Sequence, residues 1–217
     1  MLAGRETSVQ VAQRFADVLD LSADAAVVGV DMPIGLLDQA VPGGRDCDRR
    51  ARRLLGRRAC CVFTPPVRSA LRAGEYARAL ALNRRSSAAR LGISIECFGL
   101  FAKLREVDAA LRRRPALLRR VREIHPELAF RAMARARAGL PPKRSAPGRA
   151  ERLALLERRF PDVRAAVARP PRGAAADDVI DAFAVCWSAA RIAGRRAVCL
   201  PARPCHDARG LPMAIWY

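Results

Sequence analysis

The sequence predicts an α/β fold in which helices flank a mixed sheet and a block of helices separates the two clearest strands. Three segments predict it. An apolar run at residues 25–30 is too short for a helix and has turn signals on both sides, which is typical of a strand buried on both faces. In residues 121–125, Val121, Glu123 and His125 alternate with Arg122 and Ile124 as in a strand, and a proline stops the ladder. Residues 177–192 have the length and spacing of an amphipathic helix.

Helix-capping residues and the spacing of apolar residues predict the first helix and the first strand. Thr7 or Ser8 can cap a helix that presents Val11, Phe15, Val18 and Leu19 on one face and ends at the turn of residues 21–24. The strand of residues 25–30 then leads to Asp31 and a Pro-Ile-Gly turn. Asp31 therefore lies at the carboxyl end of a strand, where open α/β sheets bind their ligands.

Helices dominate the next stretch, an insertion at about residues 45–115. Asp46 is expected to cap a very basic helix that closes at Gly56. A short apolar piece at 60–63 ends at two prolines, and further helices are expected over 75–91 and from about 100 to 114.

The remaining elements complete one domain over residues 1–217. After the strand at 121–125, Glu127 opens a helix. Basic loops at 141–148 and 169–173 flank a helix at 149–160, and the helix at 177–192 follows. The closing residues 210–217 are predicted to form a strand at a sheet edge.

Composition constrains the partners. The formal charge is +19, with 40 basic residues against 21 acidic ones. Because clustered cations gain affinity for phosphate by releasing counterions, nucleic acid, DNA or RNA, is the expected partner, and a merely solvated basic surface is the alternative. Only Lys103 and Lys143 are lysines. Because nearly every other basic residue is arginine, these two lysines favour a role in phosphate contact, although chance placement explains them equally well.

The chain has no apolar run long enough to cross a bilayer and no signal-peptide pattern, so we expect a cytoplasmic protein with no membrane contact. Seven cysteines without a CxxC pair fit reduced thiols. Cys199, Cys205 and His206 match no zinc motif. The oligomeric state stays open.

Acidic residues on different elements carry the predicted chemistry. Asp178 and Asp181 lie three apart on a helix and can face one point, together with Asp31 at its strand end and Glu127. Converging carboxylates repel one another unless a divalent cation lies between them, and Mg²⁺ or Mn²⁺ takes oxygen ligands. Two such ions about 4 Å apart catalyse phosphodiester hydrolysis. Alternatively, turn amides satisfy Asp31, and Asp177 is a helix N-cap.

Seven segments occur together in one order. They are DMPIGL at 31–36, RDCDRRARRLLGRR with VFTPP, FGLFAKLREVD, HPEL at 125–128, PPKRSAPGRAERLALL, DDVID at 177–181 and the closing GLPMAIWY. In this the chain resembles a bacterial domain-of-unknown-function family of predicted ribonuclease H-like nucleases. The resemblance runs from about the first helix to the last residue.

The resemblance implies a ribonuclease H-like mixed sheet with a carboxylate metal site, and hence a hydrolase. Asp31, Asp178 and Asp181 would be metal ligands by position. Glu127 would be a further ligand and His125 would orient a water or a phosphate, although His125 is equally well explained as a strand-end residue. The family opens with a strand bearing Asp-Gly and a hairpin, whereas this chain starts at the following helix, so we expect an N-terminally truncated form whose first-strand aspartate is absent.

Three functions follow as alternatives. The first is a metal-dependent nuclease that uses the acids named above, with substrate contacts from Lys103, Lys143 and the basic helix residues Arg49 and Arg52. The second is a non-catalytic nucleic-acid-binding module of the same fold. The third is a nucleotide-dependent phosphotransferase, for which Pro42-Gly43-Gly44 is the one glycine-rich segment that could form a phosphate loop.

Overall fold

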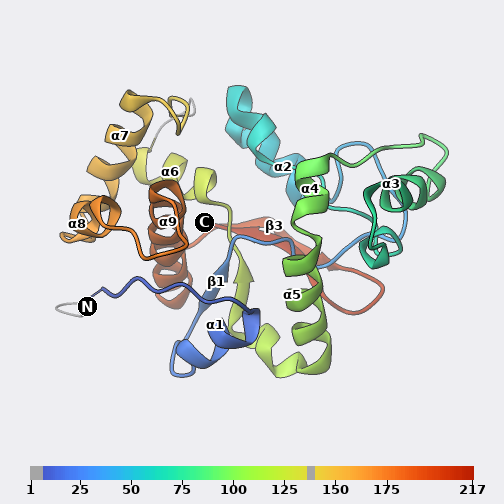
Figure 1. The fold of residues 1–217 in the computed structure, drawn as a ribbon, viewed down its shortest axis with the longest axis horizontal. Coiled ribbons are helices and arrows are strands. Elements are labelled where there is room, and N and C mark those ends of the chain that lie inside the picture. The colour runs from blue at the N-terminus through green and yellow to red at the C-terminus, as the bar shows by residue number, and fades with distance from the viewer. Residues whose placement is uncertain (1–6, 136–139) are drawn as a thin grey trace.

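A computed structural model describes residues 7–135 and 140–217 of the chain. Figure 1 shows its strands in the middle, with helices gathered in two groups on either side. The helices are α1 (Phe15–Leu21), α2 (Asp46–Leu55), α3 (Tyr76–Arg85), α4 (Ile95–Gly99), α5 (Phe101–Arg113), α6 (Pro126–Ala134), α7 (Ala146–Glu157), α8 (Val163–Ala168) and α9 (Ala176–Ala193). Short 3₁₀ helices are η1 (Gly56–Cys61), η2 (Ala70–Arg72) and η3 (Pro115–Arg119).

The strands form a mixed arrangement. β1 (Val28–Val30) pairs in parallel with β2 (Val121–Glu123), and Val28 lies opposite Val121. β3 (Cys199–His206) and β4 (Pro212–Trp216) pair antiparallel. A single parallel bridge between Ile124 and Trp216 joins β2 to β4, which gives the spatial order β1, β2, β4, β3.

Helices cover both faces of β1. On one face Val28 and Val30 pack in a core with α1 and α5, which contribute Phe15, Leu19 and Val107. The other face meets α9, where a Cβ atom added at Gly29 would lie 2.6 Å from Val185 Cγ1 and 2.5 Å from Ile124 Cδ1. Glycine at this position therefore allows α9 to pack directly on the strand. A second core joins α6, α7, α8 and α9 around buried residues such as Phe130, Leu156 and Phe183.

The predicted order of elements is confirmed for the most part, with five corrections. The closing strand β4 lies between β2 and β3 and not at a sheet edge. The first helix begins at Phe15 and not at Thr7 or Ser8, and Val11 is exposed. The helix expected over 75–91 ends at Arg85. The N-cap of α2 is Arg45 and not Asp46, because the Asp48 carboxylate accepts from the Arg45 backbone N–H at 2.9 Å. Residues 199–206 form a strand, β3, that was not predicted. The expected absence of the family's first strand concerns residues 1–6, which lie outside the described residues.

Candidate functional site

Asp31 directly follows β1, and buried groups fix the turn after it. The Ile34 backbone N–H donates to Glu123 Oε2 at 2.7 Å, and the Leu36 N–H donates to Asp207 Oδ2 at 2.9 Å. Gly35 takes a positive φ of 76°, where an added Cβ would lie 2.9 Å from the Leu211 carbonyl oxygen. Glycine is therefore required for this close approach.

Arg45 ties the turn to the sheet. It is 2% exposed and donates to the Ile34 carbonyl at 2.8 Å, to Glu123 Oε1 at 2.6 Å and to Asp48 Oδ1 at 2.6 Å. A buried arginine with two carboxylate partners satisfies charges that would otherwise be costly to bury. The loop after β1 is consequently held in one conformation, and Asp31 with it.

An open groove of about 530 Å³ runs between β1 and α9. Three carboxylate residues line it, Asp31, Asp178 and Asp181, together with apolar residues of α9 such as Ala182 and Val185. Two elements that lie about 150 residues apart in the sequence thus place their acids on one surface, as the sequence predicted.

Asp31 is exposed in the groove, and its carboxylate has no hydrogen-bond or ion-pair partner among residues 7–135 and 140–217. Desolvation by the surrounding protein, and then the charges of Asp181 and Glu123, raise the pKa of Asp31 to about 7, against a smaller opposite effect of Lys143. A carboxylate in this position is stabilised by a cation.

Asp181 already has a cation beside it. Lys143 Nζ donates to Asp181 Oδ2 at 2.8 Å across 38 residues of sequence, and the lysine side chain is 39% exposed. Burial raises the pKa of Asp181, and the hydrogen bond and charge of Lys143 oppose that rise. The same pair raises the pKa of Lys143 against its partial burial, so the ammonium is charged at neutral pH.

Glu127 is in a buried ion pair. Both of its carboxylate oxygens accept from Nη2 of Arg152 at 2.8 Å, and Arg58 Nη2 lies 3.6 Å from Oε1. Arg152 is 1% exposed and also donates to the carbonyls of Pro141 and Gly148, both at 2.9 Å. Glu127 thereby anchors the loop that carries Lys143.

His125 lies largely buried next to the site. Its Nε2 is 3.2 Å from the Cys61 carbonyl oxygen, and because a carbonyl only accepts, Nε2 carries the proton and Nδ1 is the acceptor. Nδ1 has no partner within the described residues. Burial lowers the pKa of His125, so the ring is neutral at pH 7. His125 and Asp31 both line a small cavity of about 20 Å³, enough for one water molecule.

The remaining predicted residues have other contacts. Asp178 Oδ2 accepts from the Ala175 backbone N–H at 2.9 Å, which caps α9, whereas Asp177 pairs with Arg149 at 2.8 Å and is not the N-cap. Arg52 donates to the Val62 carbonyl at 2.9 Å and to Thr64 Oγ1 at 2.8 Å, and Arg49 donates to the Gly44 carbonyl. Lys103 is exposed on α5, with no ion pair to any described residue.

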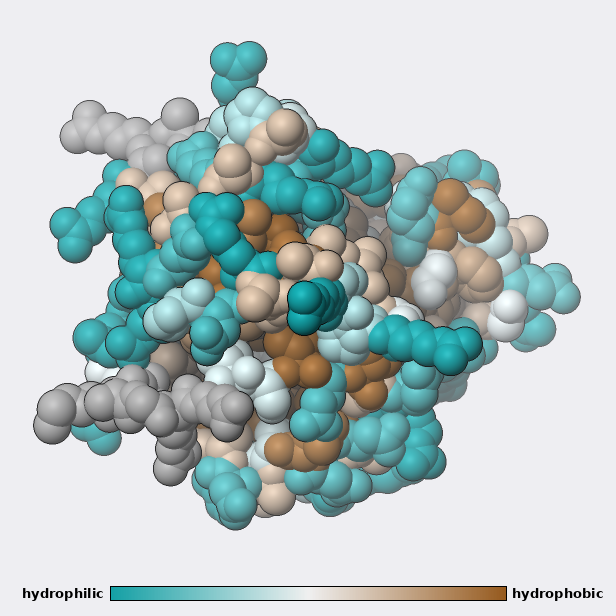
Figure 2. Space-filling view, turned by 60° about the vertical axis from the view of Figure 1, so that its left-hand side comes forward, coloured by the Kyte–Doolittle hydropathy of each residue, from teal (hydrophilic) through white to brown (hydrophobic). Residues whose placement is uncertain are grey.

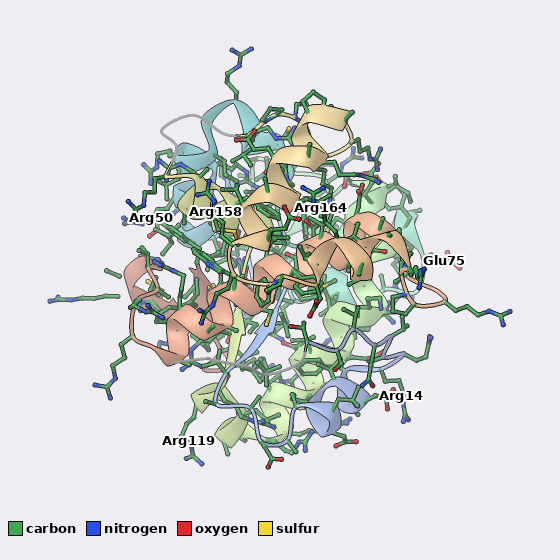
Figure 3. The ribbon with its side chains drawn as sticks, turned by 90° about the vertical axis from the view of Figure 1, so that its left-hand side faces the viewer. Arg14, Arg50, Glu75, Arg119, Arg158 and Arg164 are labelled. Atoms are coloured by element: carbon green, nitrogen blue, oxygen red, sulfur yellow. The ribbon has the colours of Figure 1, made fainter. Side chains whose placement is uncertain are left out.

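The basic charge is widely distributed. The labelled arginines in Figure 3, Arg14, Arg50, Arg119, Arg158 and Arg164, come from separate elements and are spread over the view. Figure 2 likewise shows hydrophilic residues around much of the face on the α7, α8 and α9 side, with apolar residues gathered in its middle. Part of the arginine content is structural, since Arg45, Arg68 and Arg152 are buried.

The described residues contain no group of three or more His, Cys, Asp or Glu side chains close enough to hold a metal ion. Asp31 and Asp181 nevertheless line one groove, and the charge of Asp181 is, after desolvation, a cause of the raised pKa of Asp31. Mg²⁺ is commonly held by one or two carboxylates with waters and substrate oxygens completing its shell. Asp31 and Asp181 are the two groove residues that could supply such carboxylate ligands.

Fold and groove together define an α/β protein with an acidic groove between a sheet edge and a long helix. A family model described as a protein of unknown function (DUF429) matches residues 1–206. The chain belongs to this family. No curated protein and no solved structure matches it. No helix within the described residues is long and apolar enough to cross a membrane.

Proposed function

We propose that the protein is a divalent-metal-dependent nuclease of ribonuclease H-like type, which hydrolyses phosphodiester bonds of nucleic acid. The observation that carries this proposal is the Asp31 carboxylate, which lies in an open groove beside Asp181 and has no partner among the described residues. Repulsion between two carboxylates at one point is relieved by a shared hard cation.

The reaction adds water across the phosphodiester. The water oxygen bonds to phosphorus, the bond from phosphorus to one ester oxygen breaks, and one water proton ends on the leaving alcohol while the other is released from the new phosphate monoester. Bound between the two acids, a divalent ion would supply a Lewis acid for the phosphoryl oxygens and lower the pKa of a water.

The chain's own residues would supply position and charge. Asp31 and Asp181 would hold the ion, and the Lys143 ammonium lies where it can attract a phosphate oxygen. Neutral His125, with its unpartnered Nδ1, can accept a hydrogen bond from a water in the small cavity that it shares with Asp31. The turn fixed by Arg45 and Glu123 keeps Asp31 in place while substrate binds.

The net charge of +19 supports a polyanionic substrate. Because the exposed arginines are spread over many elements, we expect backbone contacts without sequence preference.

The test is cleavage of single- and double-stranded DNA and RNA in Mg²⁺ or Mn²⁺. Asp31→Asn should lose at least a hundredfold in rate, whereas the matched control Asp38→Asn, at an exposed position of the loop that follows the turn, should cleave like wild type. Cleavage by Asp31→Asn at the wild-type rate would refute the proposal.

A non-catalytic nucleic-acid-binding module is the second candidate. The arginine pairing of Glu127 and the lysine pairing of Asp181 favour it, because both carboxylates are already neutralised. This candidate predicts salt-sensitive binding and no cleavage in any metal.

A further inference from the structure

We propose that Arg58 binds a phosphate group of the nucleic-acid backbone beside the groove between β1 and α9. The proposal rests on the proposed function for the identity of its ligand. It assigns a contact to a residue that sequence patterns do not distinguish from its many arginine neighbours.

Arg58 combines burial with unused hydrogen-bond donors. Three arginines of α2 use their donors, since Arg49 and Arg52 donate to backbone carbonyls and Arg50 pairs with Asp46 at 2.7 Å. The Arg58 side chain is 18% exposed, its buried Nε has no hydrogen-bond partner, and its Nη atoms donate to no described residue. A guanidinium has five N–H donors and no acceptor, and buried donors are normally satisfied, so Arg58 is short of acceptors.

The carboxylate beside Arg58 is already neutralised. Among the described residues, Glu127 is the one acid within ion-pair distance of Arg58, and both of its oxygens accept from Arg152 at 2.8 Å. Arg58 Nη2 lies 3.6 Å from Oε1, beyond hydrogen-bond distance. Two guanidiniums thus share one carboxylate. Because a largely buried charge is costly unless it is paired, an anion that binds at Arg58 is stabilised there.

A second buried donor without a partner projects from the same face of α6. Arg131 lies four residues after Glu127, the spacing at which two helical side chains are neighbours, and its buried Nε also has no hydrogen-bond partner. The surroundings of Glu127 therefore hold more hydrogen-bond donors than acceptors, which favours an oxyanion as ligand.

Contacts of η1 place Arg58 near the candidate site. Three residues after Arg58, the Cys61 carbonyl oxygen lies 3.2 Å from His125 Nε2, and His125 lines the same small cavity as Asp31. Asp31 follows β1 and Glu127 follows β2, and the two strands are parallel. Arg58 therefore lies at the same end of the sheet as the acids of the groove.

The ligand that fits this position is a phosphate. The planar fork of an arginine donates two parallel hydrogen bonds to a phosphate, and the net charge of +19 favours a polyanion over a single small anion. Lys143 carries a second cation at the groove, where it pairs with Asp181 at 2.8 Å. A nucleic-acid strand can present one phosphate to Lys143 and another to Arg58, and such contacts fix the position of the backbone.

The test is binding of short fluorescent oligonucleotides, as single-stranded DNA and as RNA, to the whole protein in EDTA at several KCl concentrations. Binding is then measured independently of the proposed reaction. Arg58→Met should weaken binding about tenfold. The slope of log affinity against log salt should become shallower by about 0.7, because one phosphate contact is lost. Arg58→Lys keeps the charge and should retain the wild-type slope.

Arg119→Met is the matched control. Arg119, labelled in Figure 3, is an exposed arginine of η3, which precedes β2 and so lies at the opposite end of that strand from Glu127. Its replacement lowers the net charge by the same amount, and affinity and slope should stay at wild-type values. Arg58→Met should also keep the melting temperature of the free protein within about 2 °C of wild type, because Glu127 retains both hydrogen bonds to Arg152.

Wild-type affinity and slope in Arg58→Met, or an equal loss in Arg119→Met, would overturn the phosphate contact while leaving the nuclease proposal intact. A loss of affinity with an unchanged slope and a melting temperature lowered by about 6 °C or more would overturn it too, because Arg58 would then act on the fold.

Calorimetry with inorganic phosphate separates two sources of the ligand. Binding of inorganic phosphate that depends on Arg58, together with oligonucleotide binding that does not, would overturn the assignment to the nucleic-acid backbone. The predicted change of slope in Arg58→Met, but no cleavage of any nucleic acid by wild type in Mg²⁺ or Mn²⁺, would refute the nuclease proposal and leave the phosphate contact standing.

Discussion

Replacing Arg152 by methionine should destabilise the protein strongly. Arg152 is 1% exposed and makes four hydrogen bonds, two to the Glu127 carboxylate at 2.8 Å and two to backbone carbonyls at 2.9 Å. Removing one partner of a buried ion pair leaves the other charge buried, which costs about 3–5 kcal/mol. Arg58, 3.6 Å from Glu127, keeps part of the compensation, so we expect a loss near the lower end, about 3 kcal/mol.

Urea unfolding at pH 7 measures this loss, and the melting temperature should fall by about 6–12 °C for a chain of this size. The control is Arg149→Met, which removes a pair to Asp177 on a side chain that is 46% exposed and should cost less than about 1 kcal/mol. The double variant Arg152→Met with Glu127→Gln should recover much of the stability, because no unpaired charge is left. A single variant within about 1 kcal/mol of wild type, or a double variant no better than the single one, would show that the pair does not anchor the lysine loop.

Two further predictions concern the groove. Mn²⁺ affinity should rise with pH, because the pKa of Asp31 is raised to about 7 and a metal ion binds the ionised carboxylate. Titrations should give about tenfold tighter Mn²⁺ binding at pH 8 than at pH 6. A binding affinity that does not change with pH would argue against Asp31 as a ligand. Gly29→Ala should lower the free energy of unfolding by about 1–3 kcal/mol, because its Cβ would lie 2.5 Å from Ile124 and 2.6 Å from Val185. Gly74→Ala, with open space around it, is the control for thermal unfolding, and equal melting temperatures for the two variants would contradict the close packing of α9 on β1.

Much of the fold is visible in the sequence because local patterns determine it. The strand before Asp31, the basic helix that ends at Leu55 and the long helix of residues 176–193 all combine clear periodicity with turn or cap residues. Local patterns do not predict the strand at 199–206, because Pro201 and Pro204 argue against a strand interior. The strand forms nevertheless, because β3 lies at a sheet edge, where prolines are tolerated.

Local sequence patterns predict only part of the candidate site. Spacing on a helix and a strand end predict that Asp31, Asp178 and Asp181 can face one point, and in the structure all three line one groove. The partners of these acids depend on contacts between distant segments, such as Lys143 with Asp181 and Arg152 with Glu127, and no local pattern encodes them. The ion pairs of the buried Arg45 with Asp48 and Glu123 are not predictable either, because Arg45 is one of many arginines in a very basic segment.

The most direct test of the cation site is anomalous diffraction from crystals of the protein soaked in Mn²⁺. We predict one strong anomalous peak in the groove between β1 and α9, directly coordinated by carboxylate oxygens of Asp31 and Asp181, with the Lys143 ammonium beside it. Absence of a peak in that groove at Mn²⁺ concentrations that saturate binding, or a peak held by other residues, would contradict the proposed site.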